Sequence, residues 1–138
     1  LFSKNVSTKG DFSAVNLLIN GKEVKFIDFE QYSTKGYWLE DACYLTLHSE
    51  GKLVDDLVWQ KEFLKRYILR LKENQISFNN NYLRFWLLYT SIQHFLIRIT
   101  QYKLGLDNVT IDECIIKESN ILYFMNMNTY YQFLTELE

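Results

Sequence analysis

Apolar and polar positions in the first part of the chain follow a strand-like pattern. Residues 15–19 form a short apolar run, Asn20-Gly21 follows, and residues 24–28 form a second run. Two such runs joined by Asn-Gly predict a β-hairpin with a two-residue type I′ turn, in which both turn residues have positive φ. The hairpin would bring Asn16, near the start of one strand, close to Asp28, at the end of the other. We expect residues 1–8 to be an extended lead-in and residues 31–36 a polar loop.

From residue 37 onward, apolar residues recur at helical spacing. The pattern predicts helices over residues 37–48, 55–72, 82–103, from 110 onward, and over 128–137. Gly105 is expected to end the third helix. Thr110-Ile111-Asp112-Glu113 has the form of a capping box, which predicts the start of the fourth helix.

The same spacing predicts the buried side of each helix. For the first helix this side consists of Leu39, Ala42, Cys43, Leu45 and Leu47. For the second it consists of Leu57, Phe63, Leu64, Tyr67, Ile68 and Leu71. For the third it consists of Phe85, Leu88, Tyr89, Ile92, Phe95, Leu96 and Ile99, with a narrow polar strip of Arg84, Ser91 and Arg98. For the last two it consists of Ile111, Cys114, Ile115, Leu122 and Met125, and of Tyr131, Phe133, Leu134 and Leu137.

These elements predict an α+β fold that is mainly α, with a short β-hairpin followed by a helical bundle. We expect one lobe over residues 1–138, with the helical body over residues 37–138. The chain has 138 residues, 48% of them hydrophobic and 17% aromatic, which excludes disorder. Its net charge of -2, without a basic run, argues against nucleic acid as a partner.

Three further features of the sequence concern the location of the protein in the cell and whether the chain is part of a longer one. The longest apolar stretch, residues 82–99, contains Arg84, His94 and Arg98, so we expect a buried helix and no membrane span. Two distant cysteines predict a reducing, cytoplasmic compartment. The first residue is Leu1 and not Met, which suggests a fragment of a longer protein, natural or engineered. The sequence leaves the oligomeric state open.

The candidate chemistry is concentrated in residues 9–30, where Asp11, Asn16 and Asp28 supply two carboxylates and one amide oxygen. Phosphoryl transfer needs an acidic residue that orients the attacking hydroxyl and accepts its proton, and it needs ligands for Mg²⁺. Mg²⁺ prefers hard oxygen ligands of this kind. Taken singly, Asp11 and Asn16 are better explained as turn residues. Taken together across the hairpin, they predict a phosphotransferase site.

The spacing Asp11-x-x-x-x-Asn16, followed by Ile27-Asp28-Phe29-Glu30, resembles the catalytic loop and metal motif of kinase-like phosphotransferases. Gly10-Asp11 and Asp28-Phe29-Glu30 are most similar to the aminoglycoside phosphotransferase and choline kinase branch. The resemblance covers residues 9–42 and implies the C-terminal lobe of the protein-kinase-like fold. It implies that Asp11 is the catalytic base, that Asn16 and Asp28 hold Mg²⁺, and that Asp41 starts a helix and braces the catalytic loop.

The resemblance also implies ATP as phosphate donor and a small-molecule hydroxyl as acceptor, whether aminoglycoside-, choline- or sugar-like. No Gly-rich loop precedes the motif, so we expect the N-terminal nucleotide-binding lobe to be absent from this chain, and the chain alone to be inactive. The family has His two residues before the base, where this chain has Lys9. Two alternatives stay open: a catalytically silent kinase-like binding module, and a structural helical interaction domain in which Asp11, Asn16 and Asp28 do not converge.

Several other residues have simpler interpretations. Glu30 is either a substrate- or metal-side carboxylate or a solvated loop acid. His48 and His94 have no partner at metal-ligand spacing, and His94 is expected to be a core histidine. Cys43 and Cys114 are expected to be small buried hydrophobic residues. Asp55-Asp56 are interpreted as helix-start residues.

Overall fold

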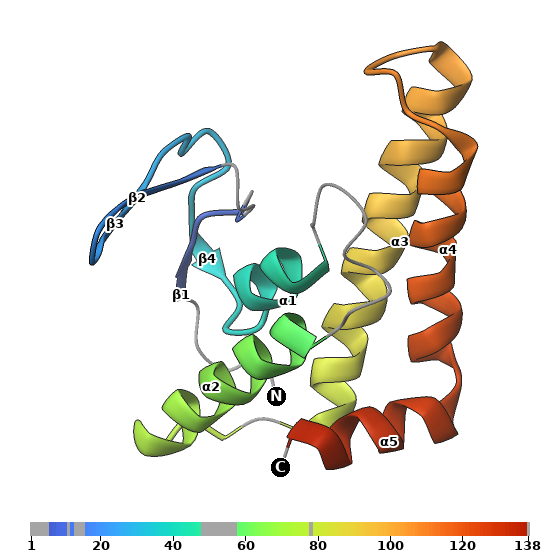
Figure 1. Ribbon diagram of the computed structural model, residues 1–138. Helices are drawn as coiled ribbons and strands as arrows, with labels where there is room; N and C mark the ends of the chain where they lie inside the picture. Colours follow the sequence, from blue (N-terminus) through green and yellow to red (C-terminus); the bar gives the residue numbers. More distant parts are fainter. Residues whose placement is uncertain (1–5, 11, 13–15, 48–57, 78, 138) are drawn as a thin grey trace. The chain divides into compact units, whose positions relative to one another are not determined.

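The computed structural model describes residues 6–10, 12, 16–47, 58–77 and 79–137 (Figure 1). The elements in chain order are β1 Val6–Thr8, β2 Leu17–Asn20, β3 Glu23–Phe26, β4 Ser33–Gly36, α1 Glu40–Leu47, α2 Val58–Glu73, α3 Asn80–Leu104, α4 Ile111–Met125 and α5 Met127–Leu137. The predicted α+β, mainly helical class is confirmed. Contacts divide the chain into two compact units, Leu1–Leu64 and Lys65–Glu138, which are described separately below.

The first unit contains a two-stranded antiparallel sheet that the sequence did not predict. β1 pairs with β4, with Val6 opposite Gly36 and Thr8 opposite Ser33. Residues 1–8 were predicted to be an extended lead-in and residues 31–36 a polar loop. The two strands have no sequence signal because they are short and polar and pair only with each other, far apart in the chain. Gly36 makes the pairing possible: a Cβ there would lie 2.1 Å from Cγ2 and Oγ1 of Thr8.

Gly36→Ala is therefore expected to lower the free energy of unfolding by about 1–3 kcal/mol, because overpacking forces the two strands apart. Urea denaturation measures the change. Lys35→Ala, an exposed substitution in the same strand, should stay within about 0.5 kcal/mol of the wild type. Equal stability of the two variants would contradict the close approach of Gly36 to Thr8.

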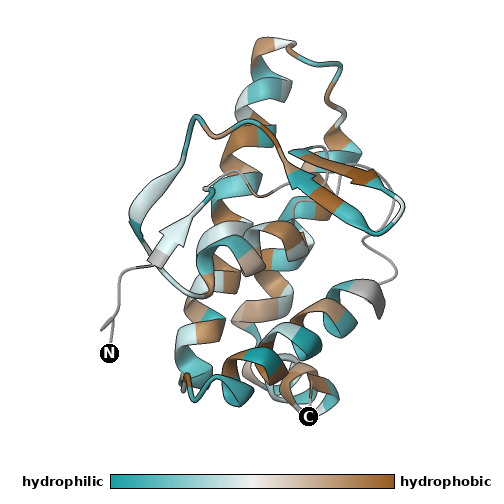
Figure 2. Cartoon of the chain, turned by 90° about the vertical axis from the view of Figure 1, so that its left-hand side faces the viewer, coloured by the Kyte–Doolittle hydropathy of each residue, from teal (hydrophilic) through white to brown (hydrophobic). Residues whose placement is uncertain are grey.

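The predicted hairpin is present as β2 and β3, but its turn is shifted by one residue. Asn20 pairs with Glu23, so the turn residues are Gly21 and Lys22. Of these two only Gly21 has positive φ, at 59°, so the predicted type I′ turn at Asn20-Gly21 is wrong. A glycine with an open Cβ position accommodates this conformation without strain. The hairpin carries exposed hydrophobic residues on both strands (Figure 2).

α1 begins at Glu40, three residues later than predicted, because residues 38 and 39 form a turn. All five residues of its predicted buried side are buried. In α2, Leu64, Ile68 and Leu71 are buried at helical spacing, as predicted, whereas Phe63 and Tyr67 are only half-buried. Leu57, His48, and Asp55-Asp56 lie outside the described residues.

The second unit contains α3, α4 and α5, with α3 and α4 running side by side as an antiparallel pair (Figure 1). The predicted caps are confirmed: Gly105 ends α3 at φ 66°, and Thr110 Oγ1 accepts a hydrogen bond from the Glu113 N–H at 3.3 Å. The guanidinium of Arg84 donates to the last carbonyls of α4, Phe124 O at 2.9 Å and Met125 O at 2.8 Å. This pairing satisfies carbonyls that the helix leaves open at its end.

The predicted buried side of α3 is wrong. The buried residues are Leu83, Trp86, Leu87, Thr90, Ser91 and His94. Phe85, Tyr89, Ile92 and Leu96 are 44–55% exposed. The helix is apolar on both sides, so periodicity alone cannot select one. Ser91 is tolerated inside because its hydroxyl donates to Leu87 O at 2.7 Å.

The predicted sides of α4 and α5 are correct in part: Cys114, Phe133 and Leu137 are buried as predicted, whereas Tyr131 is exposed. In α4 the buried residues are Cys114, Lys117, Asn120 and Phe124, whereas Ile111, Ile115, Leu122 and Met125 are exposed. A long Lys side chain can bury its aliphatic stem, which a count of apolar residues does not anticipate. In α5 the buried residues are Tyr130, Phe133 and Leu137. Within the described residues, no helix has the length and apolar character needed to cross a membrane.

Candidate active site

Asp41 ties the start of the candidate loop to helix α1. Its Oδ2 accepts a hydrogen bond from the Lys9 N–H at 2.7 Å, and its Oδ1 accepts one from the Gly10 N–H at 3.0 Å. Asp41 lies in the first turn of α1, where a carboxylate is also favoured by the helix dipole. The prediction that Asp41 starts a helix and braces this segment is confirmed by these contacts.

Gly10 packs too closely for any other residue. Its φ is 84°, and a Cβ there would lie 2.7 Å from the Cβ and the carbonyl oxygen of Gln31. Only glycine adopts this conformation without strain and leaves this space free. The residue that precedes Asp11 is therefore fixed by its backbone geometry as well as by Asp41.

Lys9 connects the same segment to the residue predicted to bind metal. Its side chain is buried, at 6% exposure. Its Nζ donates to the carbonyl oxygen of Asp28 at 2.6 Å and lies 5.8 Å from the centre of the Phe29 ring. A cation over an aromatic face is attracted by the ring quadrupole. Lys9 thus joins the loop before Asp11 to the segment that follows β3.

The hairpin brings Asn16 beside the end of the returning strand. The Ile27 N–H donates to Asn16 O at 3.0 Å, which extends the β2–β3 ladder by one step beyond Leu17 and Phe26. Asn16 is buried, whereas Asp28 is exposed and has a φ of 58°. Asp tolerates this left-handed conformation better than most residues, and such strained positions cluster at functional sites.

A ring contact ties the far side of position 11 to the hairpin. The rings of Phe12 and Phe26 lie 5.2 Å apart between centroids. The residues that flank position 11 are therefore anchored on one side to Asp41 and on the other to β3. Asp11 itself lies outside the described residues.

The other titratable side chains differ in burial, and burial raises the pKa of some of them. Burial, together with the charge of Asp41, raises the pKa of Glu40, and a hydrogen bond from the Tyr37 N–H opposes this rise. Burial raises the pKa of Cys43 well above its ordinary value, so its thiol stays protonated and is no nucleophile. Cys43 and Cys114 are free and buried, as predicted. Glu30 is exposed, and His94 is buried.

In the described part of the chain, no three His, Cys, Asp or Glu side chains come together in a way that could hold a metal ion. That part contains two of the three predicted oxygen donors, the Asn16 amide and the Asp28 carboxylate. One carboxylate with one amide fits Mg²⁺, which commonly takes few protein ligands and completes its shell with water and phosphate oxygens. Convergence of Asn16 and Asp28 on one ion stays a prediction.

The contacts of Lys9 and Gly10 were not predicted from the sequence. The signal for Gly10 was its position directly before Asp11, since a glycine at such a place often marks a positive φ. For Lys9, only its place two residues before Asp11 was noted.

No protein-family model matches the chain, and neither do any of the curated proteins or solved structures compared with it.

Proposed function

We propose that residues 1–138 form the catalytic and substrate-binding lobe of an ATP- and Mg²⁺-dependent phosphotransferase that phosphorylates a hydroxyl group of a small molecule. The observation that carries the proposal is the bracing of Lys9 and Gly10 by Asp41. This contact holds the segment before Asp11 against α1, and the Lys9 ammonium joins the same segment to Asp28 at the end of the hairpin. We propose further that a nucleotide-binding lobe lies outside these residues and that the whole protein acts in the cytoplasm.

Each residue has a distinct role in the proposed mechanism. Asp11 orients the acceptor hydroxyl and takes its proton as the oxygen attacks the γ-phosphorus, and ADP leaves in line. Asn16 and Asp28 would hold Mg²⁺, which would neutralise negative charge on the phosphates when bound. Asp41 and Lys9 keep the two halves of the site in register. Positioning of this kind is the main contribution that a protein makes to phosphoryl transfer.

A catalytically silent binding module is the second candidate, and Lys9 is the observation that favours it. Its ammonium donates to the carbonyl oxygen of Asp28, so a fixed positive charge lies next to the proposed metal ligand. A cation there repels Mg²⁺ and weakens its binding. A silent module would bind nucleotide without transferring phosphate.

The test uses the longest natural protein that contains residues 1–138. It is incubated with ATP, Mg²⁺ and a panel of aminoglycosides, amino alcohols and sugars, and ADP formation is measured beside the thermal midpoint. The phosphotransferase proposal expects acceptor-dependent ADP and a rise in the midpoint with ATP and Mg²⁺. A rise without ADP supports the silent module. Neither a rise nor ADP contradicts both.

A further inference from the structure

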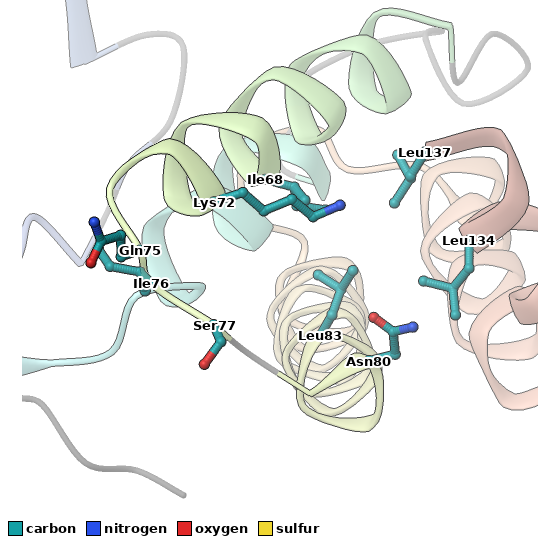
Figure 3. Close-up of a pocket in the computed structure, with 9 residues that line it drawn as sticks. All are labelled: Ile68, Lys72, Gln75, Ile76, Ser77, Asn80, Leu83, Leu134 and Leu137. Carbon is teal, nitrogen blue, oxygen red and sulfur yellow. The ribbon is translucent and has the colours of Figure 1, made fainter.

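The second unit contains a pocket of about 360 Å³ that lies between α2, α3 and α5 (Figure 3). Every residue that lines it belongs to Lys65–Glu138. Its volume is at the lower end of the range of small-molecule sites, which run from about 300 to 1,000 Å³. A pocket of this size fits a small ligand and does not fit a folded partner.

The deep part of the pocket is apolar. Ile68 of α2, Leu83 of α3, and Leu134 and Leu137 of α5 line it. Figure 3 shows the side chains of Leu83, Leu134 and Leu137 converging on the same space. Burying a methylene group in such a space contributes about 0.8 kcal/mol. An alkyl tail is therefore the part of a ligand that this surface favours.

The polar edge of the pocket carries a positive charge. The Lys72 side chain reaches across the opening, and the Asn80 amide faces the same space from α3 (Figure 3). No hydrogen bond or ion pair joins the Lys72 ammonium to any residue that the structure describes. No lining residue is acidic. An anionic group at this edge would gain a charge-assisted hydrogen bond from Lys72 and a second donor from Asn80.

We propose that this pocket binds a medium-chain carboxylate, with its alkyl tail against Leu83, Leu134 and Leu137 and its carboxylate on Lys72 and Asn80. An uncharged alcohol of the same length matches the apolar part alone, and an alkyl ammonium is repelled by Lys72. The charge at the edge therefore sets the order of affinity. This binding does not depend on whether the chain transfers phosphate.

The test titrates the 138-residue chain with octanoate, octanol and octylammonium and follows the methyl groups of the pocket leucines by NMR. Octanoate should shift these signals and bind about three- to tenfold more tightly than octanol, since ion pairs at exposed sites are modest. Octylammonium should bind most weakly. Equal affinities for the three, or shifts confined to residues outside the pocket, would overturn the proposal.

Two variants separate charge recognition from non-specific binding. Lys72→Met keeps the aliphatic stem and should reduce octanoate affinity to that of octanol. Lys65→Met, an exposed lysine on the same helix, should leave it unchanged. Leu134→Trp should fill the pocket and weaken all three ligands at least tenfold. Unchanged octanoate affinity in Lys72→Met would contradict the assigned carboxylate position.

Discussion

Asp11→Asn is expected to lower turnover by about 10²- to 10⁴-fold, the usual contribution of a general base. Asn has the size and the hydrogen-bonding oxygen of Asp but cannot accept the proton of the acceptor hydroxyl at neutral pH. The variant should therefore keep its fold and its affinity for ATP. Steady-state ADP formation in the longest natural protein, with a responsive acceptor, measures the change.

Asp107→Asn is the matched control for this prediction. Asp107 is exposed and has a φ of 56°, and its carboxylate accepts a hydrogen bond from the Gln101 amide at 2.8 Å. Asn can make the same hydrogen bond, so turnover should stay near that of the wild type. Near-normal turnover in Asp11→Asn, with its thermal midpoint unchanged, would show that Asp11 is not the base.

Asp41→Ala is expected to lower the free energy of unfolding by about 2 kcal/mol and turnover by at least tenfold. The substitution removes the acceptor of two consecutive part-buried N–H groups, those of Lys9 and Gly10. A buried donor left without its partner costs about 1–3 kcal/mol. Urea denaturation measures the loss of stability. Faster amide exchange at Lys9 and Gly10 would show that it arises in the loop.

Asp112→Ala is the control for Asp41→Ala. It measures how much stability is lost when a helix loses an acidic residue from its first turn without losing the two hydrogen bonds that Asp41 accepts. Asp112 lies in the first turn of α4, as Asp41 lies in that of α1. Removing the Asp112 carboxylate should lower the free energy of unfolding only by the loss of its interaction with the helix dipole, about 0.3–1 kcal/mol. Amide exchange at Lys9 and Gly10 should not change. Equal losses of stability in the two variants would contradict a bracing role for Asp41.

Local patterns in the sequence predicted the elements well where the signal lies within a few residues. The helix start at Thr110, the helix end at Gly105 and the buried side of α1 are all observed. Each depends on neighbours along the chain, which the sequence displays directly. The turn of the hairpin was misplaced by one residue because Asn20 and Gly21 are both good turn residues.

Long-range features were not predictable in this way. The β1–β4 sheet pairs Val6 with Gly36 and Thr8 with Ser33, which are far apart in the sequence, and its strands have little apolar character. The buried sides of α3 and α4 depend on what packs against them, because apolar residues occur on more than one face. For the candidate site, the sequence identified Asp41, but the contact of Lys9 with Asp28 required the structure. The pocket near Lys72 had no sequence signal, since its residues come from three separate segments.

Paramagnetic broadening by Mn²⁺ tests whether Asn16 and Asp28 form one metal site with the proposed base, Asp11, directly beside it. Mn²⁺ prefers the same oxygen ligands as Mg²⁺. At Mn²⁺ concentrations well below that of the chain, the amide signals of residues 11, 16 and 28 should broaden first. Asp28→Asn should remove the broadening at all three positions. Broadening spread over unrelated acidic residues, or unchanged in Asp28→Asn, would contradict a shared site.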